Sequence, residues 1–412
     1  MGQKNRIKNI GIIEGFYGKP WTHENRLDVI DFLRNNNLNT YVYAPKNDPY
    51  HRDLWKEPYS LEEADKLQEI IKKANDYLIN FVYCISPGKN IDLTDENDIQ
   101  LVSKKLLAIN QNNISSFALL MDDIDYFLNE TEKNRFLSPG IAHAYLANKV
   151  YDSLKTQIKN LEFFICPTEY WQNWNTTYRQ DLYAYLNENI TVFFTGYNTI
   201  AKTISSEDII DAFQIFGHRL AIWDNYPTND ANKDRIYLGP LLNRPHILDK
   251  EIINTYVMNP MNQWELSKIA LITAADYLSN PLDYQPEKSL EKAISYLSKE
   301  WHVSKESLDL FVRLNQSTRL KESILKDFIE DIDKSSNLKI WLEKLRKSHQ
   351  ELNSVNSNLL EEIEPWLDKM FKEIKYLEAF IENQYIIDYK DNYNLGFNFG
   401  SYAQRKIGGN YE

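Results

Sequence analysis

The stretch Phe117-Ala118-Leu119-Leu120-Met121-Asp122-Asp123 is a run of five apolar residues that ends in two adjacent carboxylates. A run that is apolar on both faces predicts a strand of a parallel sheet covered on both sides. Seven further runs of this kind occur in the first two-thirds of the chain: Ile10–Ile13, Thr40–Ala44, Phe81–Ile85, Phe163–Cys166, Val192–Thr195, Leu220–Trp223 and Ile252–Val257. The sequence therefore predicts eight parallel strands.

Segments with helical spacing separate these runs. The segment Leu61 to Tyr77 is an example, with Ser60 as its predicted N-cap and Glu63 three residues further on. Eight alternating strand and helix units fit an α/β fold of the (β/α)8 TIM-barrel type, whose typical size is roughly 250 residues. An open doubly wound sheet is the alternative, but its glycine-rich G-x-G-x-x-G turn is absent from the sequence.

The pattern of apolar, strand-like runs ends at about Pro286. The apolar residues after it have helical spacing, which predicts a C-terminal all-α helical bundle region. Its apolar stripe is Leu342, Leu345, Leu352, Val355, Leu359, Trp366, Met370, Ile374, Leu377 and Ile381. Pro365 predicts a break or the first turn of a new helix. We expect a catalytic barrel at 1–285, a helical domain at 286–390 and an irregular tail at 391–412. The stripe must be buried. We expect part of it to pack on the barrel or within its own bundle, and a homodimer face is the alternative.

The composition is that of a globular protein, with 43% hydrophobic and 26% charged residues. The formal net charge of −12 disfavours nucleic acid and anionic membranes as partners. Cys84 and Cys166 each lie in an apolar run, which predicts two buried thiols without a disulfide. The first nine residues are polar and basic with no apolar segment behind them, and no stretch reaches the roughly 18 apolar residues of a membrane span. These features predict a cytoplasmic protein, unless a leader has been removed.

The active site of such a barrel lies at the carboxyl ends of the strands, so the residues after each run are the candidates. The segments after the runs are Glu14–Trp21, Pro45–Arg52, Ser86–Gly88, Asp122–Asp125, Pro167–Tyr170, Gly196–Tyr197, Asp224–Asp230 and Asn259–Pro260. Their carboxylates, amides and phenols suit a ligand that is rich in hydroxyl groups.

The adjacent acids Asp122 and Asp123 carry the sharpest chemical signal. Burial at a strand end separates the pKa values of two carboxyl groups, and acid catalysis of glycoside cleavage needs one protonated group. A metal site and a structural role, such as helix capping, are the alternatives. There is no H-E-x-x-H motif and no calcium loop, so metal partners are lacking. Neighbours on a regular strand face opposite sides, so both acids can enter one pocket only if the strand ends or bulges there.

In these residues the chain resembles family 84 of the glycoside hydrolases, which contains the protein O-GlcNAcases and related bacterial β-N-acetylglucosaminidases. The matching motifs occur in the same order: Glu14–Gly18, Tyr43–Lys46, Ser86–Gly88, Asp122–Ile124, Cys166–Tyr170, Trp223–Asn225 and Asn259–Pro260. Each motif is weak alone, but seven in one order are specific. The resemblance implies a (β/α)8 barrel followed by helices.

The resemblance also implies a role for each matching residue. Asp122 would orient and polarise the N-acetyl group of the substrate, and Asp123 would be the general acid and then the general base. The substrate-binding residues would be Gly15, Lys46, Tyr170, Trp223, Asn225, Asp230 and Asn259. No metal or other cofactor is implied.

The implied activity is that of a retaining exo-β-N-acetylglucosaminidase acting on terminal β-linked GlcNAc of glycoproteins or oligosaccharides. Its mechanism is substrate-assisted and passes through an oxazoline, an exception to the rule of two enzyme carboxylates. Three alternatives stay open at this stage: a hyaluronidase-type glycosidase, a catalytically silent sugar-binding protein and a barrel metallo-hydrolase.

Overall fold

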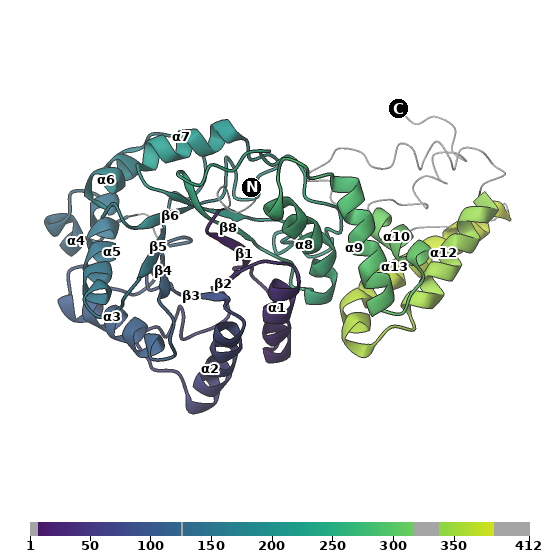
Figure 1. The fold of residues 1–412 in the computed structure, drawn as a ribbon, viewed down its shortest axis with the longest axis horizontal. Coiled ribbons are helices and arrows are strands. Elements are labelled where there is room, and N and C mark those ends of the chain that lie inside the picture. Colours follow the sequence, from purple (N-terminus) through teal and green to yellow (C-terminus); the bar gives the residue numbers. More distant parts are fainter. Residues whose placement is uncertain (1–6, 125–126, 317–337, 383–412) are drawn as a thin grey trace. The chain divides into compact units, whose positions relative to one another are not determined.

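The computed structural model describes residues 7–124, 127–316 and 338–382. Its centre is a closed barrel of parallel strands in the order β1 to β8, which closes because β1 pairs with both β2 and β8 (Figure 1). The strands are β1 (Asn9–Glu14), β2 (Thr40–Tyr43), β3 (Asn80–Ile85), β4 (Ser116–Leu120), β5 (Glu162–Cys166), β6 (Thr191–Phe194), β7 (Leu220–Asp224) and β8 (Ile253–Met258). The (β/α)8 barrel predicted from the eight apolar runs is confirmed.

Helices connect successive strands from β1 to β7, whereas residues 225–252 between β7 and β8 contain no helix. Figure 1 shows α1 to α7 around the outside of the ring of strands. They are α1 (His23–Asn35), α2 (Leu61–Asp76), α3 (Glu96–Asn110), α4 (Glu130–Arg135), α5 (Pro139–Lys155), α6 (Thr177–Tyr185) and α7 (Ser206–Phe216), while α8 (Trp264–Ser279) follows β8. The predicted N-cap of α2 is confirmed, since the Ser60 hydroxyl accepts a hydrogen bond from the backbone N–H of Glu63.

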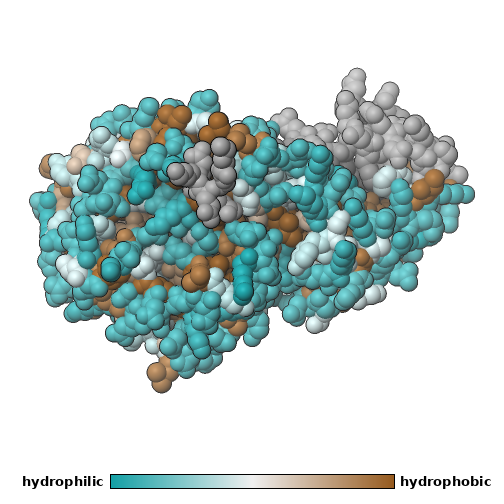
Figure 2. Space-filling view, viewed as in Figure 1, coloured by the Kyte–Doolittle hydropathy of each residue, from teal (hydrophilic) through white to brown (hydrophobic). Residues whose placement is uncertain are grey.

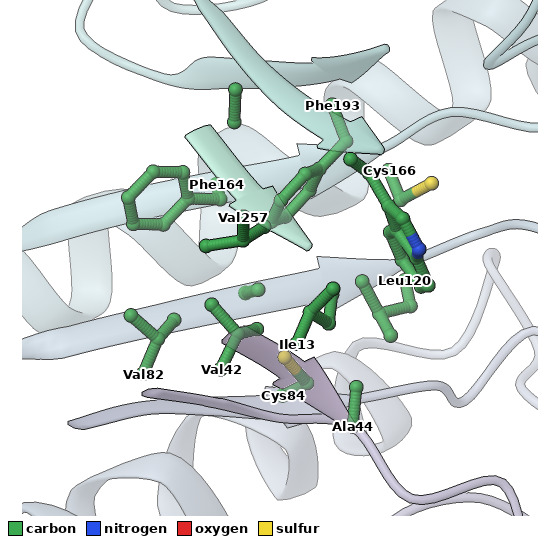
Figure 3. Close-up of a cluster of buried hydrophobic side chains, with 13 residues drawn as sticks. Ile13, Val42, Ala44, Val82, Cys84, Leu120, Phe164, Cys166, Phe193 and Val257 are labelled. Atoms are coloured by element: carbon green, nitrogen blue, oxygen red, sulfur yellow. The ribbon is translucent and has the colours of Figure 1, made fainter. Parts of the chain in front are cut away.

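The interior of the barrel is a packed apolar core (Figure 3). Its members are Ile13, Val42, Ala44, Val82, Cys84, Ala118, Leu120, Phe164, Cys166, Phe193, Ala221, Trp223 and Val257. Several come from alternate positions of one strand, because alternate side chains of a strand face the same side. Both cysteines are buried in this core and form no disulfide, as the sequence predicts.

Four described helices follow α8: α9 (Pro286–Glu300), α10 (Lys305–Leu314), α12 (Leu338–Leu352) and α13 (Ser357–Ile381). The predicted C-terminal helical region is confirmed over these residues, whereas the predicted tail at 391–412 lies outside the described residues. Helix α12 packs on α10 and on α13. Glu351 accepts hydrogen bonds from the backbone and hydroxyl groups of Ser304, and the Ser348 hydroxyl donates to the carbonyl of Ser307.

The prediction of a helix boundary at Pro365 is wrong, because α13 continues through this residue. The apolar side chains Leu359 and Ile363 before the proline and Trp366 and Met370 after it are all buried. Burial of this continuous stripe outweighs the local cost of a proline in the helix.

The chain forms two compact units that are each discontinuous in sequence. The first comprises Met1–Tyr226, Asn243–Asn262 and Leu278–Asp283, and the second comprises Pro227–Leu242, Gln263–Tyr277 and Tyr284–Glu412. Within the second unit the Tyr284 hydroxyl donates to the carbonyl of Leu241, and Glu362 accepts from the N–H of Leu266. The domain boundaries at residues 285 and 390 stay predictions, as does the homodimer.

The face drawn in Figure 2 is mainly hydrophilic. Among the described residues no helix combines the length and the hydropathy that a membrane crossing requires.

Candidate active site

The barrel brings most of the predicted site residues together at the carboxyl ends of its strands. Eight of the nine belong to the first compact unit, and each of the eight contacts at least one of the others: Gly15, Lys46, Asp122, Asp123, Tyr170, Trp223, Asn225 and Asn259. Asp230 belongs to the second unit and is half-buried. Its place beside the others stays a prediction.

Both acids reach the same side because β4 ends before them. The strand stops at Leu120, and Asp123 adopts a left-handed backbone conformation with φ of 54°. The strict alternation of side chains therefore does not extend to this pair. The Nζ atom of Lys46 lies 2.6 Å from Asp122 Oδ2 and 3.8 Å from Asp123 Oδ2. The sequence required that the strand end or bulge before both acids could enter one pocket. The structure meets this condition, because β4 ends at Leu120 and a turn follows.

Asp122 is a buried carboxylate with a buried counter-charge. Its side chain is 6% exposed and that of Lys46 is 2% exposed. Burial by itself raises the pKa of Asp122, but the charge and hydrogen bond of Lys46 outweigh it and hold the pKa below its ordinary value. Burial lowers the pKa of Lys46, and the neighbouring Asp122 more than reverses this. Asp122 is therefore ionised at neutral pH.

One oxygen of Asp122 is left without a partner. Lys46 takes Oδ2, whereas Oδ1 is buried and has no hydrogen bond within the described residues. An unpaired buried acceptor costs about 1–3 kcal/mol. The Nε1 donor of Trp223 is likewise buried and without a hydrogen bond there. The site thus holds an unused acceptor and an unused donor, which a polar ligand can satisfy.

Asp123 differs from Asp122 in its exposure and its partners. Its side chain is 37% exposed. The Tyr17 hydroxyl donates to Oδ2 at 2.6 Å, and the Tyr170 hydroxyl lies 3.5 Å from Oδ1. Arg52 donates in turn to the Tyr17 hydroxyl at 2.9 Å. Asp123 is therefore an accessible carboxyl group whose orientation is set by a phenol, a geometry that suits proton exchange with a bound molecule.

A chain of amide groups joins the ends of β7, β8 and β1. The backbone N–H of Gly15 donates to Asn259 Oδ1 at 3.2 Å, and Asn259 Nδ2 donates to Asn225 Oδ1 at 2.8 Å. Asn225 Nδ2 donates to the carbonyl of Thr199 at 2.6 Å. This chain fixes the orientation of both amides, and each amide nitrogen retains a second hydrogen for a ligand.

Trp223 forms a wall of the site and requires glycine at position 15. A Cβ atom at Gly15 would lie 2.2 Å from Cζ2 of Trp223, so the indole covers the glycine backbone. The ring also makes an edge contact with Phe193 and lies 5.6 Å from Lys46 Nζ. Tyr170 packs against the apolar cluster that contains Trp223. The result is an apolar surface beside the carboxylates.

A protein-family model described as beta-N-acetylglucosaminidase matches residues 10–313. The chain belongs to the β-N-acetylglucosaminidase family. The matched range includes all nine predicted site residues.

Relatives of this family member include the protein O-GlcNAcases of Rattus norvegicus and Mus musculus. Each is 35% identical to the chain over 277 residues, which are 66% of this chain and 30% of the relative. The chain thus spans less than a third of the length of these relatives. A solved structure of a mutant O-GlcNAc hydrolase from Thermobaculum terrenum superposes with a TM-score of 0.85 at 30% identity. The superposition covers 91% of this chain and 84% of that one.

Arg179 holds the loop that carries Tyr170 in this family member, a role that was not predicted from the sequence. The guanidinium group of Arg179 is buried, and its side chain is 1% exposed. It donates to the carbonyl oxygens of Glu169, Trp171, Gln172 and Trp174 and pairs with the Glu169 carboxylate at 3.2 Å. No local pattern marks Arg179, because it lies in α6 and looks like an ordinary helix residue in the sequence.

The support of β7 was likewise not predicted from the sequence. Arg244 forms a bidentate ion pair with Asp224, in which Nε lies 2.6 Å from Oδ2 and Nη2 lies 2.6 Å from Oδ1. The Tyr256 hydroxyl donates to Oδ2 of the same carboxylate at 2.7 Å. Asp224 stands between Trp223 and Asn225, so this pair fixes both flanking residues. Tyr17 and Arg52 were within the quoted strand-end segments but had no assigned role. Tyr17 follows β1 and Arg52 follows β2, so their placement after neighbouring strands was the available signal.

Among the described residues no group of three or more His, Cys, Asp or Glu side chains has a geometry that could hold a metal ion.

Proposed function

We propose that the chain is a retaining exo-β-N-acetylglucosaminidase that removes terminal β-linked GlcNAc by substrate-assisted catalysis. The observation that carries this proposal is the unpaired Oδ1 of the ionised Asp122. A buried anionic acceptor beside an indole wall suits the N–H and methyl groups of an acetamide. Glucose, which lacks the acetamido group, would leave this oxygen unpaired.

In the first step the acetamido oxygen attacks the anomeric carbon and the bond to the leaving oxygen breaks. The Asp122 carboxylate accepts a hydrogen bond from the acetamido N–H. This bond orients the acetamido group and stabilises the positive charge that develops on that group. Asp123 gives its proton to the leaving oxygen. The products of this step are a free alcohol and a bicyclic oxazoline that keeps its N–H proton, so that it is an oxazolinium ion paired with the Asp122 carboxylate.

In the second step Asp123, now a carboxylate, takes a proton from water as the water attacks the anomeric carbon. The oxazoline opens, the acetamide is restored, and the new hydroxyl has the configuration of the original bond. The 37% exposure of Asp123 supports this role, because both the leaving group and water must reach it.

The remaining residues bind the sugar in this proposal. Lys46 uses one of its hydrogens on Asp122 and can offer another to a ring hydroxyl. Asn225 and Asn259 each retain an N–H that can donate to a sugar hydroxyl, and the Asp230 carboxylate would accept a hydrogen bond from a sugar hydroxyl. Gly15 brings its backbone to the sugar, while Tyr170 and Trp223 line the acetamide pocket.

The relatives named as protein O-GlcNAcase and O-GlcNAc hydrolase support GlcNAc-bearing proteins as the substrate class. The test is hydrolysis of 4-nitrophenyl N-acetyl-β-glucosaminide with the corresponding glucoside as control. We expect release of nitrophenol from the first compound only. Activity on both, on neither, or only before treatment with a chelator contradicts the proposal. A cytoplasmic location likewise stays a prediction.

The Lys46→Met variant should move the acid limb of the pH profile of kcat/KM to higher pH. Burial then acts on Asp122 without its counter-charge, and its pKa rises. In the unsubstituted protein this ionisation stabilises the fold above the unfolded pKa of about 3.9, and the stabilisation is lost as the pH falls through the lowered folded value.

Removing one partner of a buried ion pair also costs about 3–5 kcal/mol of stability. Lys56→Met is the matched control, since Lys56 pairs with Asp98 while its side chain is 39% exposed. An acid limb that stays in place in Lys46→Met would show that Lys46 does not set the ionisation of Asp122.

A further inference from the structure

The turn that carries Asp123 adopts a left-handed backbone conformation, which is uncommon for residues other than glycine, although aspartate tolerates it better than most. Its φ of 54° lies in the left-handed region, where few residues other than glycine are found. Such a conformation persists only where the surrounding structure fixes it. The contacts of this turn therefore decide where the Asp123 carboxyl group points.

Hydrogen bonds hold the turn on its N-terminal side. The N–H of Met121 donates to the carbonyl of Cys166 at 2.8 Å, and the Thr168 hydroxyl donates to the carbonyl of Met121, also at 2.8 Å. These bonds fix the chain as it leaves β4. On the other side Arg52 makes only a long contact of 3.5 Å with the carbonyl of Asp123.

Apolar packing holds the turn on its C-terminal side. A Cβ atom at Gly88 would lie 2.7 Å from Cγ2 and 2.8 Å from Cδ1 of Ile124, and its three nearest atoms all belong to Ile124. The side chain of Ile124 thus occupies the space that a side chain at Gly88 would need. This contact is possible because β3 and β4 are paired, so the loops after them are neighbours.

Glycine at position 88 is required by this contact and not by its own backbone. Its φ is not in the positive range, unlike those of Gly18, Gly196 and Gly217. Alanine would therefore fit the backbone of the β3–α3 loop, and Ile124 is the neighbour that stands in its way.

We propose that Gly88 and Ile124 are positioning residues, whose packing holds Asp123 in the left-handed conformation that presents its carboxyl group to the leaving oxygen. Neither side chain takes part in the reaction, and Gly88 acts through Ile124 on the acid. This inference rests on the proposed role of Asp123 as general acid.

The test compares Gly88→Ala, Ile124→Ala and the double variant. In Gly88→Ala the new methyl displaces Ile124, and a misplacement of about 1 Å can cost about 10²-fold in rate. We expect kcat to fall most for substrates with poor leaving groups, because only these need the proton, whereas KM changes little. Ile124→Ala lowers kcat as well, because the packing is lost. In the double variant Cγ2 and Cδ1 are gone, so the alanine at position 88 fits and adds no further loss, and kcat matches that of Ile124→Ala within about twofold.

Ile91→Ala is the control for loss of apolar contacts, because Ile91 is half-buried like Ile124 but lies in the β3–α3 loop. We expect it to keep the leaving-group dependence of the unsubstituted protein. Equal loss on good and poor leaving groups in Gly88→Ala, or a double variant whose loss is the product of the single losses, overturns the inference.

Crystal structures of the same variants separate this inference from the proposed function. Asp123 should leave the left-handed region in Gly88→Ala, where Ile124 is displaced, and also in Ile124→Ala and the double variant, where the packing of Ile124 is lost. If the unsubstituted protein cleaves no aryl glycoside, the proposed function fails. The crystal structures still show whether the contact between Gly88 and Ile124 sets the backbone conformation of Asp123. An unchanged Asp123 in crystals of Gly88→Ala also overturns the inference. If Gly88→Ala does not fold, Ile124→Ala and the double variant must still match in kcat.

Discussion

Asp123→Asn lowers kcat/KM by about 10²–10⁴-fold for β-N-acetylglucosaminides with poor leaving groups and far less for those with good ones. The proposed proton donor is lost, but a weakly basic phenolate leaves without a proton. Asparagine preserves the shape of the side chain and can still accept the hydrogen bond of Tyr17. The effect therefore isolates the proton transfer from the geometry.

The measurement is a series of aryl glycosides whose phenols span a wide range of pKa. The plot of log kcat/KM against the phenol pKa should become steeper in Asp123→Asn. Asp95→Asn is a matched control, because Asp95 caps α3 and asparagine caps a helix equally well. Parallel plots for Asp123→Asn and the unsubstituted protein would remove Asp123 from the role of general acid.

Asp122→Asn lowers kcat/KM by about 10²–10³-fold on all of these substrates, whatever the leaving group. The amide cannot supply the negative charge that stabilises the developing oxazoline, and it leaves Lys46 buried without its counter-charge. The two acids thus differ in one readout. Loss at Asp123 depends on the leaving group, whereas loss at Asp122 does not.

Fluorination of the acetamido methyl group tests which atom is the nucleophile. Each fluorine withdraws electron density from the acetamido oxygen, so turnover by the unsubstituted protein should fall steeply along the series. A flat series, or a covalent glycosyl-aspartate detected by mass spectrometry, would assign the nucleophile to the enzyme instead of the substrate.

The strands and their order could be predicted because their signal is local. Each strand is a short apolar run bounded by polar residues, and a closed parallel barrel places the residues after every run on one face. Gly15, Asn225 and Asn259 follow their strands directly and Lys46 comes three residues after β2, so all four fell within the selected segments. The family resemblance then gave them their roles. The break predicted at Pro365 failed for the opposite reason. The rule that proline breaks a helix is local, and here burial of a continuous apolar stripe outweighs it.

The supports of the site could not be predicted, because they join residues far apart in the chain. Lys46 and Asp122 are 76 positions apart, and Tyr17 and Asp123 are 106 positions apart. Arg179 and Arg244 are ordinary charged residues in the sequence, and only their burial against backbone carbonyls and Asp224 gives them a role.

The sequence by itself determined the eight strands, the helical region after them and which residue types meet at the strand ends. Tertiary structure alone decided that Asp122 is paired and buried while Asp123 is exposed, and that a left-handed turn brings both acids to one side. The physical reason is that periodicity and burial follow from neighbouring residues, whereas charge state and side-chain direction depend on groups that only folding brings within a few ångströms.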